Sequence, residues 1–136
     1  MRHQPRSTHF ATPTLFRSIS SVAGRFNARD CAAYGTANAA LSFLTRSLAQ
    51  DFAPKVRVNA IAVGSILTEA LAGFMTDDFE KQMLAKTPMA RLGEVEDVAA
   101  CALYLASPAA SYVTGEIYGV NGGLTQIQIE MPPVDL

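Results

Sequence analysis

The sequence has few cysteines, little charge and no long apolar run. Cys31 and Cys101 stand far apart, and neither belongs to a Cys-x-x-Cys pair or to a cluster with histidine. These two facts exclude a structural zinc site and a disulfide-rich scaffold, and a reducing, cytoplasmic location is expected. The longest nearly uncharged stretch, residues 58–68, is shorter than the roughly 18 residues that a transmembrane helix needs. No membrane span is therefore predicted.

The net charge of −1 gives no electrostatic support for a nucleic-acid or anionic-membrane partner. Hydrophobic residues make up 49% of the 136 residues and charged residues 17%. This composition excludes an intrinsically disordered chain and allows one domain with a core. The charge is unevenly spread, because residues 1–29 contain five arginines and no acidic residue, and all 12 acidic residues follow.

Residues 1–17 form a basic leader without helical or alternating periodicity. Its arginines and its lack of acids resemble an organellar transit peptide, but Pro5 and Pro13 would interrupt the amphipathic helix of such a signal. The alternatives are a disordered leader or residues translated outside an ancestral reading frame. His3 and His9 lie in this leader without partner ligands, and no metal site is predicted.

From residue 18 onward the pattern is that of a folded domain. Residues 18–24 indicate the end of a strand that runs into a loop, and residues 32–51 indicate a long helix that Pro54 stops. One face of this helix is apolar and consists of Ala37, Leu41, Leu44 and Leu48, with Ala33 and Ala40 beside them. Residues 56–62 predict a strand that is buried on both sides at its carboxyl end and closed by Gly64.

Two short helices are expected at residues 68–74 and 77–85, with Thr76 as the N-cap of the second. A clearer helix covers residues 94–106, since acidic residues open it and Pro108 follows its end. Residues 117–120 predict a last short strand, closed by Asn-Gly-Gly. Helices that alternate with short strands imply βα units and a parallel sheet, so the expected fold class is α/β.

Several motifs in order make the chain similar to one family. Ser21 is followed by Tyr34 at a helix start, Arg-Val-Asn-Ala-Ile-Ala occupies residues 57–62, and Gly-Ser-Ile-Leu-Thr occupies residues 64–68. Thr-Pro-Met-Ala-Arg-Leu-Gly follows at residues 87–93, then Ser-Pro at 107–108, Val-Thr-Gly at 113–115 and Val-Asn-Gly-Gly at 120–123. Together they resemble the second half of a short-chain dehydrogenase/reductase, and they look most like 7α-hydroxysteroid dehydrogenases and 3-oxoacyl-carrier-protein reductases.

The resemblance implies an NAD(P)-dependent oxidoreductase that moves hydride between nicotinamide and a hydroxyl or carbonyl substrate. Ser21 would orient the substrate oxygen, and Tyr34 would be the acid/base. A lysine four residues after the tyrosine shares its helix face, where its charge favours phenolate and its donors hold the cofactor ribose. In this sequence that position is Asn38, which carries no charge.

The resemblance also assigns Gly64, Ile66 and Thr68 to the loop that contacts the nicotinamide of NAD or NADP. The family places the pyrophosphate on a glycine-rich turn at a helix N-terminus. No G-x-x-x-G-x-G or G-x-G-x-x-G occurs in the 136 residues. Cofactor binding by this chain alone is therefore not expected.

The expected architecture is a truncated Rossmann-type, doubly wound parallel sheet that keeps the last three strands and their helices. Residues 18–125 would be this half-domain, residues 1–17 the unmatched leader and residues 126–136 a C-terminal tail. By resemblance the full strand order is 3-2-1-4-5-6-7. The first retained strand, which contains Ile19, would then have an open edge, and an open edge promotes association.

Three functions remain open at this point. The chain is an active oxidoreductase on a small-molecule alcohol or ketone, an inactive truncated remnant of such an enzyme, or a non-catalytic module that associates with a full-length relative. By resemblance, the helix of residues 32–51 and the last helix and strand are association surfaces. A homo-oligomer or a complex with a full-length relative is expected.

Overall fold

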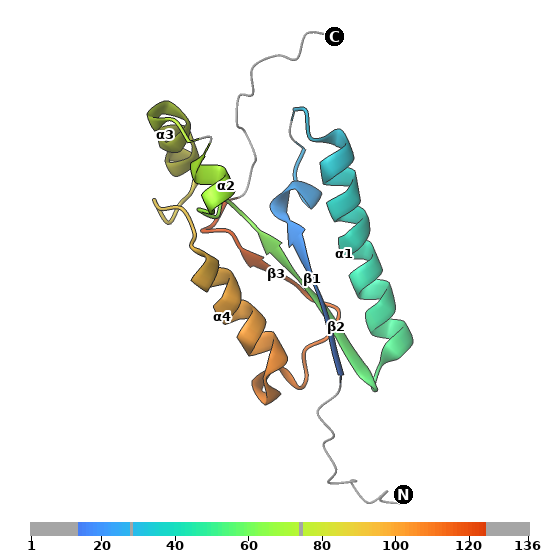
Figure 1. The fold of residues 1–136 in the computed structure, drawn as a ribbon. Helices are drawn as coiled ribbons and strands as arrows, with labels where there is room; N and C mark the ends of the chain where they lie inside the picture. The colour runs from blue at the N-terminus through green and yellow to red at the C-terminus, as the bar shows by residue number, and fades with distance from the viewer. Residues whose placement is uncertain (1–13, 28, 74, 125–136) are drawn as a thin grey trace, which may run out of the picture.

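The computed structural model describes residues 14–27, 29–73 and 75–124. Three parallel strands form one sheet in the order β1-β2-β3, with β1 at Thr14–Ser21, β2 at Val56–Val63 and β3 at Ile117–Val120. Ser21 pairs with Val63 and Val63 with Val120, so the three strands end together. All three arrows point toward the same end of the molecule in Figure 1. The expected parallel α/β sheet is confirmed.

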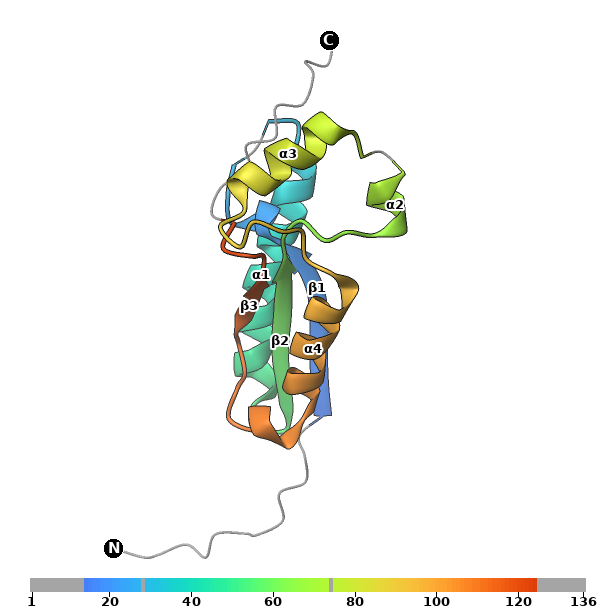
Figure 2. The same ribbon diagram turned by 90° about the vertical axis from the view of Figure 1, so that its left-hand side faces the viewer.

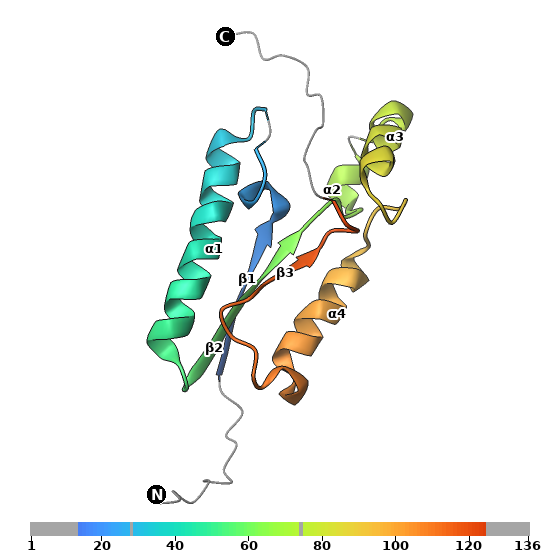
Figure 3. The same cartoon turned by 180° about the vertical axis from the view of Figure 1, so that it is seen from behind.

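One long helix covers each face of the sheet. Figures 1 and 2 show α1 (Ala32–Phe52) on one face and α4 (Val95–Ala106) on the opposite face. The short helices α2 (Glu69–Ala72) and α3 (Asp77–Lys86) lie beyond the carboxyl ends of the strands, as the rear view in Figure 3 also shows. Two 3-10 turns complete the fold, η1 at Val22–Gly24 and η2 at Pro108–Ala110.

Capping side chains explain where the later helices begin. The Thr76 hydroxyl accepts from the Phe79 amide, which confirms the predicted N-cap of α3. Glu94 and Asp97 form a capping box at the start of α4, where their negative charge also suits the helix dipole. The predicted helix ends lie within a few residues of the observed ones.

The core lies around β2, which has intermediate exposure at its two end residues and is buried in between. On the α4 face, Ile61, Leu105 and Ala110 form a buried cluster, and Val98 and Tyr118 pack against it. Ile19 pairs with Ile61 in register. Ile61 is fully buried, whereas Ile19 is 58% exposed at the open edge. The α4 face of the sheet is thus well covered over β2 and left open over β1.

The buried face of α1 differs from the predicted apolar face. Ser42, Thr45 and Ala49 are the buried residues of this helix, whereas Ala37 is exposed and Leu44 is 48% exposed. The two hydroxyls can be buried because each donates to a carbonyl oxygen of its own helix, at 3.0 Å and 2.8 Å. Small side chains thus form the buried side of α1, and its large apolar residues Phe43, Leu44 and Phe52 are exposed.

The polar residues of β2 are also buried. Arg57 is 4% exposed and Asn59 fully buried, although the alternating pattern is that of a half-exposed strand. The Arg57 guanidinium donates to the carbonyl oxygen of Leu105 at 2.8 Å, near the C-terminal end of α4. A helix C-terminus has unpaired carbonyl oxygens and favours positive charge. Arg57 therefore fastens α4 to the sheet.

Candidate functional site

The candidate site lies where the three strands end. Ser21 is the last residue of β1 and the N-cap of η1, where its hydroxyl accepts from the Ala23 amide at 3.1 Å. This contact uses a lone pair of the hydroxyl and leaves its hydrogen free to donate. Ser21 has intermediate exposure, so solvent reaches this residue.

Two glycines bring the Ser21 turn against the first turns of α1. A Cβ on Gly24 would lie 2.7 Å from the main-chain carbon of Asn38, and a Cβ on Gly35 would lie 2.9 Å from the carbonyl oxygen of Ala23. Any side chain at these positions would separate the two elements. Ser21 and the helix segment that carries Tyr34 and Asn38 are thereby brought together.

Tyr34 and Asn38 lie one helical turn apart on α1. Tyr34 is 58% exposed. The Asn38 side-chain nitrogen donates to the carbonyl oxygen of Tyr34 at 2.9 Å, and its side-chain oxygen accepts from the Ser20 hydroxyl at 3.2 Å. The motif had not pointed to Ser20. The structure identifies Ser20 as the partner of Asn38, because Ser20 is 3% exposed at the end of β1 and donates to this side chain.

Gly64, Ile66 and Thr68 follow β2 along a second loop at the same edge of the sheet. The Gly64 amide donates to the Val120 carbonyl oxygen at 2.9 Å, and a Cβ on Gly64 would lie 2.7 Å from the Cα of Asn121. Ile66 forms an isolated parallel bridge with Gly93. Thr68 is the exposed N-cap of α2, and its hydroxyl accepts from the Leu71 amide at 3.2 Å.

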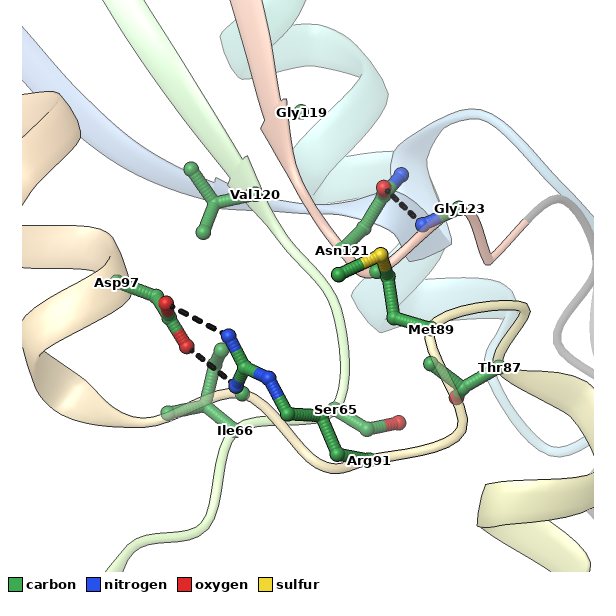
Figure 4. A pocket seen from close by; sticks show the side chains of 12 residues that line it. Ser65, Ile66, Thr87, Met89, Arg91, Asp97, Gly119, Val120, Asn121 and Gly123 are labelled. Carbon is green, nitrogen blue, oxygen red and sulfur yellow. Dashed lines mark hydrogen bonds and ion pairs between the residues drawn. The ribbon is translucent and has the colours of Figure 1, made fainter.

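A pocket of about 390 Å³ opens beside this second loop. Figure 4 shows it between the loop of Ser65 and Ile66, the segment from Thr87 to Arg91, and the end of β3 with Asn121 and Gly123. Ile66 lines this pocket, whereas Ser21, Tyr34 and Asn38 do not. No sequence pattern pointed to this pocket, because its walls come from segments that lie far apart in the sequence, including residues of β3 and α4.

An ion pair forms one wall of the pocket. Arg91 donates to both carboxylate oxygens of Asp97, at 2.8 Å and 3.0 Å, as the dashed lines in Figure 4 mark. The bonds from Arg91, together with the bond from the Glu94 amide, lower the pKa of Asp97 to about 2. The same pairing raises the pKa of Arg91. Both groups are therefore ionised at neutral pH and bound to each other.

The described residues offer no membrane span and no metal centre. In residues 14–27, 29–73 and 75–124, no helix is both long and apolar enough to cross a bilayer. The same ranges contain no group of three or more histidine, cysteine, aspartate or glutamate side chains that could hold a metal ion.

The fold is that of part of a Rossmann-type α/β domain, and the motifs lie at the ends of its parallel strands. The sequence profile of the family described as "Enoyl-(Acyl carrier protein) reductase" matches residues 16–125. The chain belongs to this family of short-chain dehydrogenases/reductases. The predicted family and the predicted partial Rossmann-type fold are both confirmed.

Curated relatives are about twice as long as the chain. An uncharacterized oxidoreductase of Mycobacterium tuberculosis is 52% identical over 120 residues, which are 88% of this chain and 46% of the relative. The 7alpha-hydroxysteroid dehydrogenase of Escherichia coli K12 is 44% identical over 110 residues, which are 80% of this chain and 43% of that enzyme. The chain thus spans less than half the length of these relatives.

Solved structures agree with this assignment. A 7 alpha-hydroxysteroid dehydrogenase in complex with NADH and 7-oxo glycochenodeoxycholic acid matches with a TM-score of 0.78 and 42% identity, over 82% of this chain and 44% of that one. A 3-oxoacyl-[acyl-carrier protein] reductase from Brucella melitensis matches with a TM-score of 0.77 and 38% identity, over 81% and 41%.

Proposed function

We propose that residues 18–125 are the part of a short-chain dehydrogenase/reductase that faces the substrate and the nicotinamide. Ser21 would orient the oxygen of an alcohol or ketone substrate, and Tyr34 would exchange a proton with it. Gly64, Ile66 and Thr68 would line the nicotinamide side of an NAD or NADP site. We further propose that the 136-residue chain by itself neither holds the cofactor nor turns over substrate.

The proposal that the chain alone does not hold the cofactor rests on what the glycines at the strand ends pack against. A pyrophosphate site needs glycine because the main chain must approach the phosphates closely, at the start of a helix. Gly24 instead packs on α1, and Gly64 packs on Asn121. Gly122 and Gly123, with φ of +60° and +85°, pack on Thr87 and Pro88. These residues do not fit the phosphates of a dinucleotide, so no hydride step is assigned to the chain alone.

A titration with NADH and NADPH tests the proposal. The purified chain should give no saturable change in nicotinamide fluorescence below about 100 μM, which corresponds to roughly −5.5 kcal/mol of binding free energy. The 7 alpha-hydroxysteroid dehydrogenase whose structure contains NADH, titrated with NADH in the same way, is the positive control. Saturable binding below that concentration would show that other residues of the chain hold the phosphates.

The outward face of α1 favours a second function, a non-catalytic module that associates with another copy or with a full-length relative. Large apolar side chains along this helix are exposed, namely Tyr34 at 58%, Phe43 at 71%, Leu44 at 48% and Phe52 at 46%. Several exposed large apolar side chains on one helix favour an interaction site.

Light scattering after size exclusion tests the association. At tens of micromolar the chain should run above its monomer mass of 14.5 kDa, and Phe43→Glu should shift it toward the monomer because a buried charge opposes an apolar contact. Leu67→Glu in the loop after β2 is the matched control, since Leu67 is also exposed, at 46%, and lies on neither α1 nor the last helix and strand. A monodisperse monomer for the unmodified chain, or an equal effect of both substitutions, would contradict an interface on α1.

A further inference from the structure

Asn38 lies where β1, η1 and α1 meet, and the protein itself binds both ends of its side-chain amide. The nitrogen Nδ2 donates to the Tyr34 carbonyl oxygen at 2.9 Å. The oxygen Oδ1 accepts from the Ser20 hydroxyl at 3.2 Å. On the third side, a Cβ on Gly24 would lie 3.0 Å from the Asn38 Cβ, so η1 packs directly against this residue.

The hydrogen-bond partners fix the orientation of the amide. A carbonyl oxygen can only accept, so the nitrogen of Asn38 must face Tyr34. This turns Oδ1 toward Ser20, whose hydroxyl can donate. Ser20 is 3% exposed, and the other acceptor of its hydroxyl is the main-chain oxygen of Asn38, at 3.4 Å. Both acceptors thus belong to the same residue.

We propose that Ser20 is a positioning residue that commits the Asn38 amide to a link between β1 and α1. Position 38, where the family resemblance expects a cofactor-holding lysine, then has a structural role in this chain. The link between β1 and α1 is argued from the contacts of Ser20 and Asn38 alone. Only its consequence for the acid/base role of Tyr34 rests on the proposed function.

The chemistry of lysine and asparagine side chains supports this structural role of position 38. Lysine carries three donors and no acceptor, so it could not accept a bond from Ser20. The asparagine amide can turn toward an outside ligand only by breaking its bonds to Ser20 and Tyr34. Loss of Oδ1 would leave the buried Ser20 hydroxyl only its longer bond, of 3.4 Å, to the main-chain oxygen of Asn38, which is also unfavourable.

The side-chain amide resonances of Asn38 in the ¹⁵N-labelled full chain test the link. They are assigned by their disappearance in Asn38→Ala. In the unmodified chain their hydrogen exchange should be at least about tenfold slower than that of Asn27, whose side chain is exposed. Ser20→Ala should shift the Asn38 resonances and remove most of this protection.

Ser42→Ala is the matched control for Ser20→Ala. The Ser42 hydroxyl donates to the main-chain oxygen of Asn38 at 3.0 Å and does not bind the amide. It is also a buried serine, at 8% exposure. Its removal should leave the side-chain resonances of Asn38 nearly unshifted, whereas a role limited to packing predicts similar shifts for both substitutions.

A double-mutant cycle by thermal unfolding gives a second, independent reading. The losses in Tm from Ser20→Ala and Asn38→Ala should not add, because either substitution removes the same contact. Additive losses, exchange of Asn38 as fast as that of Asn27, or equal shifts from the Ser20 and Ser42 substitutions would each overturn the proposal. None of these measurements depends on the cofactor titration, so the link between Ser20 and Asn38 and the proposed function can be contradicted separately.

Discussion

Replacing Asn38 by lysine should raise turnover at least tenfold in a chimera that joins residues 18–136 to the first half of an active relative. That first half supplies the phosphate site, so the chimera should bind cofactor, but its proton transfer should be slow. A cation 4–5 Å from a phenolate contributes roughly 3–4 kcal/mol at an effective dielectric of about 20. Recovery of even half of that corresponds to about a tenfold rate increase or more.

Steady-state rates from pH 6 to 9 for the chimera with and without Asn38→Lys are the measurement. The gain should be largest at neutral pH and shrink as the pH rises, because the phenol then ionises without the cation. Asn27→Lys is the matched control, since it adds the same charge at an exposed asparagine. Equal rates for the two chimeras across this range would show that the charge is not limiting and that the assigned role of Tyr34 is wrong.

Local signals in the sequence predicted the helices and the last strand well, whereas β1 begins at Thr14, inside the predicted leader, and ends at Ser21. The helix of residues 32–51 is observed at Ala32–Phe52, because a long run without helix breakers ends just before Pro54. The last strand, residues 117–120, is observed at Ile117–Val120, since the turn at Asn121 closes it. The Thr76 cap was readable because a threonine before three acidic residues satisfies the first amides of a helix.

Burial was harder to predict because it depends on what each side chain meets across the fold. The apolar face of α1 was expected to be its buried face, but the buried residues of this helix are Ser42, Thr45 and Ala49. A hydroxyl that bonds to its own helix counts as polar in a periodicity argument and behaves as a small apolar group in a core. Periodicity alone could not separate these two behaviours.

The candidate site was predictable only where one motif carries it. Ser21, Tyr34 and Asn38 were named from the resemblance to one family motif, and the two elements that hold them meet through Gly24 and Gly35, whereas their chemical roles stay predictions. The partner of Asn38 on β1 was not predicted, because Ser20 precedes the motif serine and has no sequence mark of its own. The Arg91–Asp97 pair was likewise missed, since no pattern connects a loop arginine with the first turn of the next helix.

The second large effect is expected at Asn59, in the centre of β2. Asn59→Ala should lower the free energy of unfolding by about 3 kcal/mol. The Asn59 side chain is fully buried, donates to the Val113 carbonyl oxygen at 3.0 Å and accepts from the Glu116 amide at 3.1 Å. Truncation leaves the Glu116 amide without this acceptor, which costs about 1–3 kcal/mol, and opens a small cavity, which costs about 1 kcal/mol more.

Urea unfolding followed by circular dichroism measures this loss. Gln50→Ala is the control, because Gln50 is exposed on α1 and should change stability by less than about 0.5 kcal/mol.

Arg57→Met, made alone and together with Asn59→Ala, tests whether the loss comes from these hydrogen bonds. Both side chains donate to the Val113 oxygen, Arg57 at 3.5 Å and Asn59 at 3.0 Å. A shared acceptor makes the two losses non-additive, whereas the loss of the Arg57 bond to Leu105 remains. A cost below about 1 kcal/mol for Asn59→Ala would mean that water replaces the side chain, and that Asn59 does not hold the segment before β3 against the sheet.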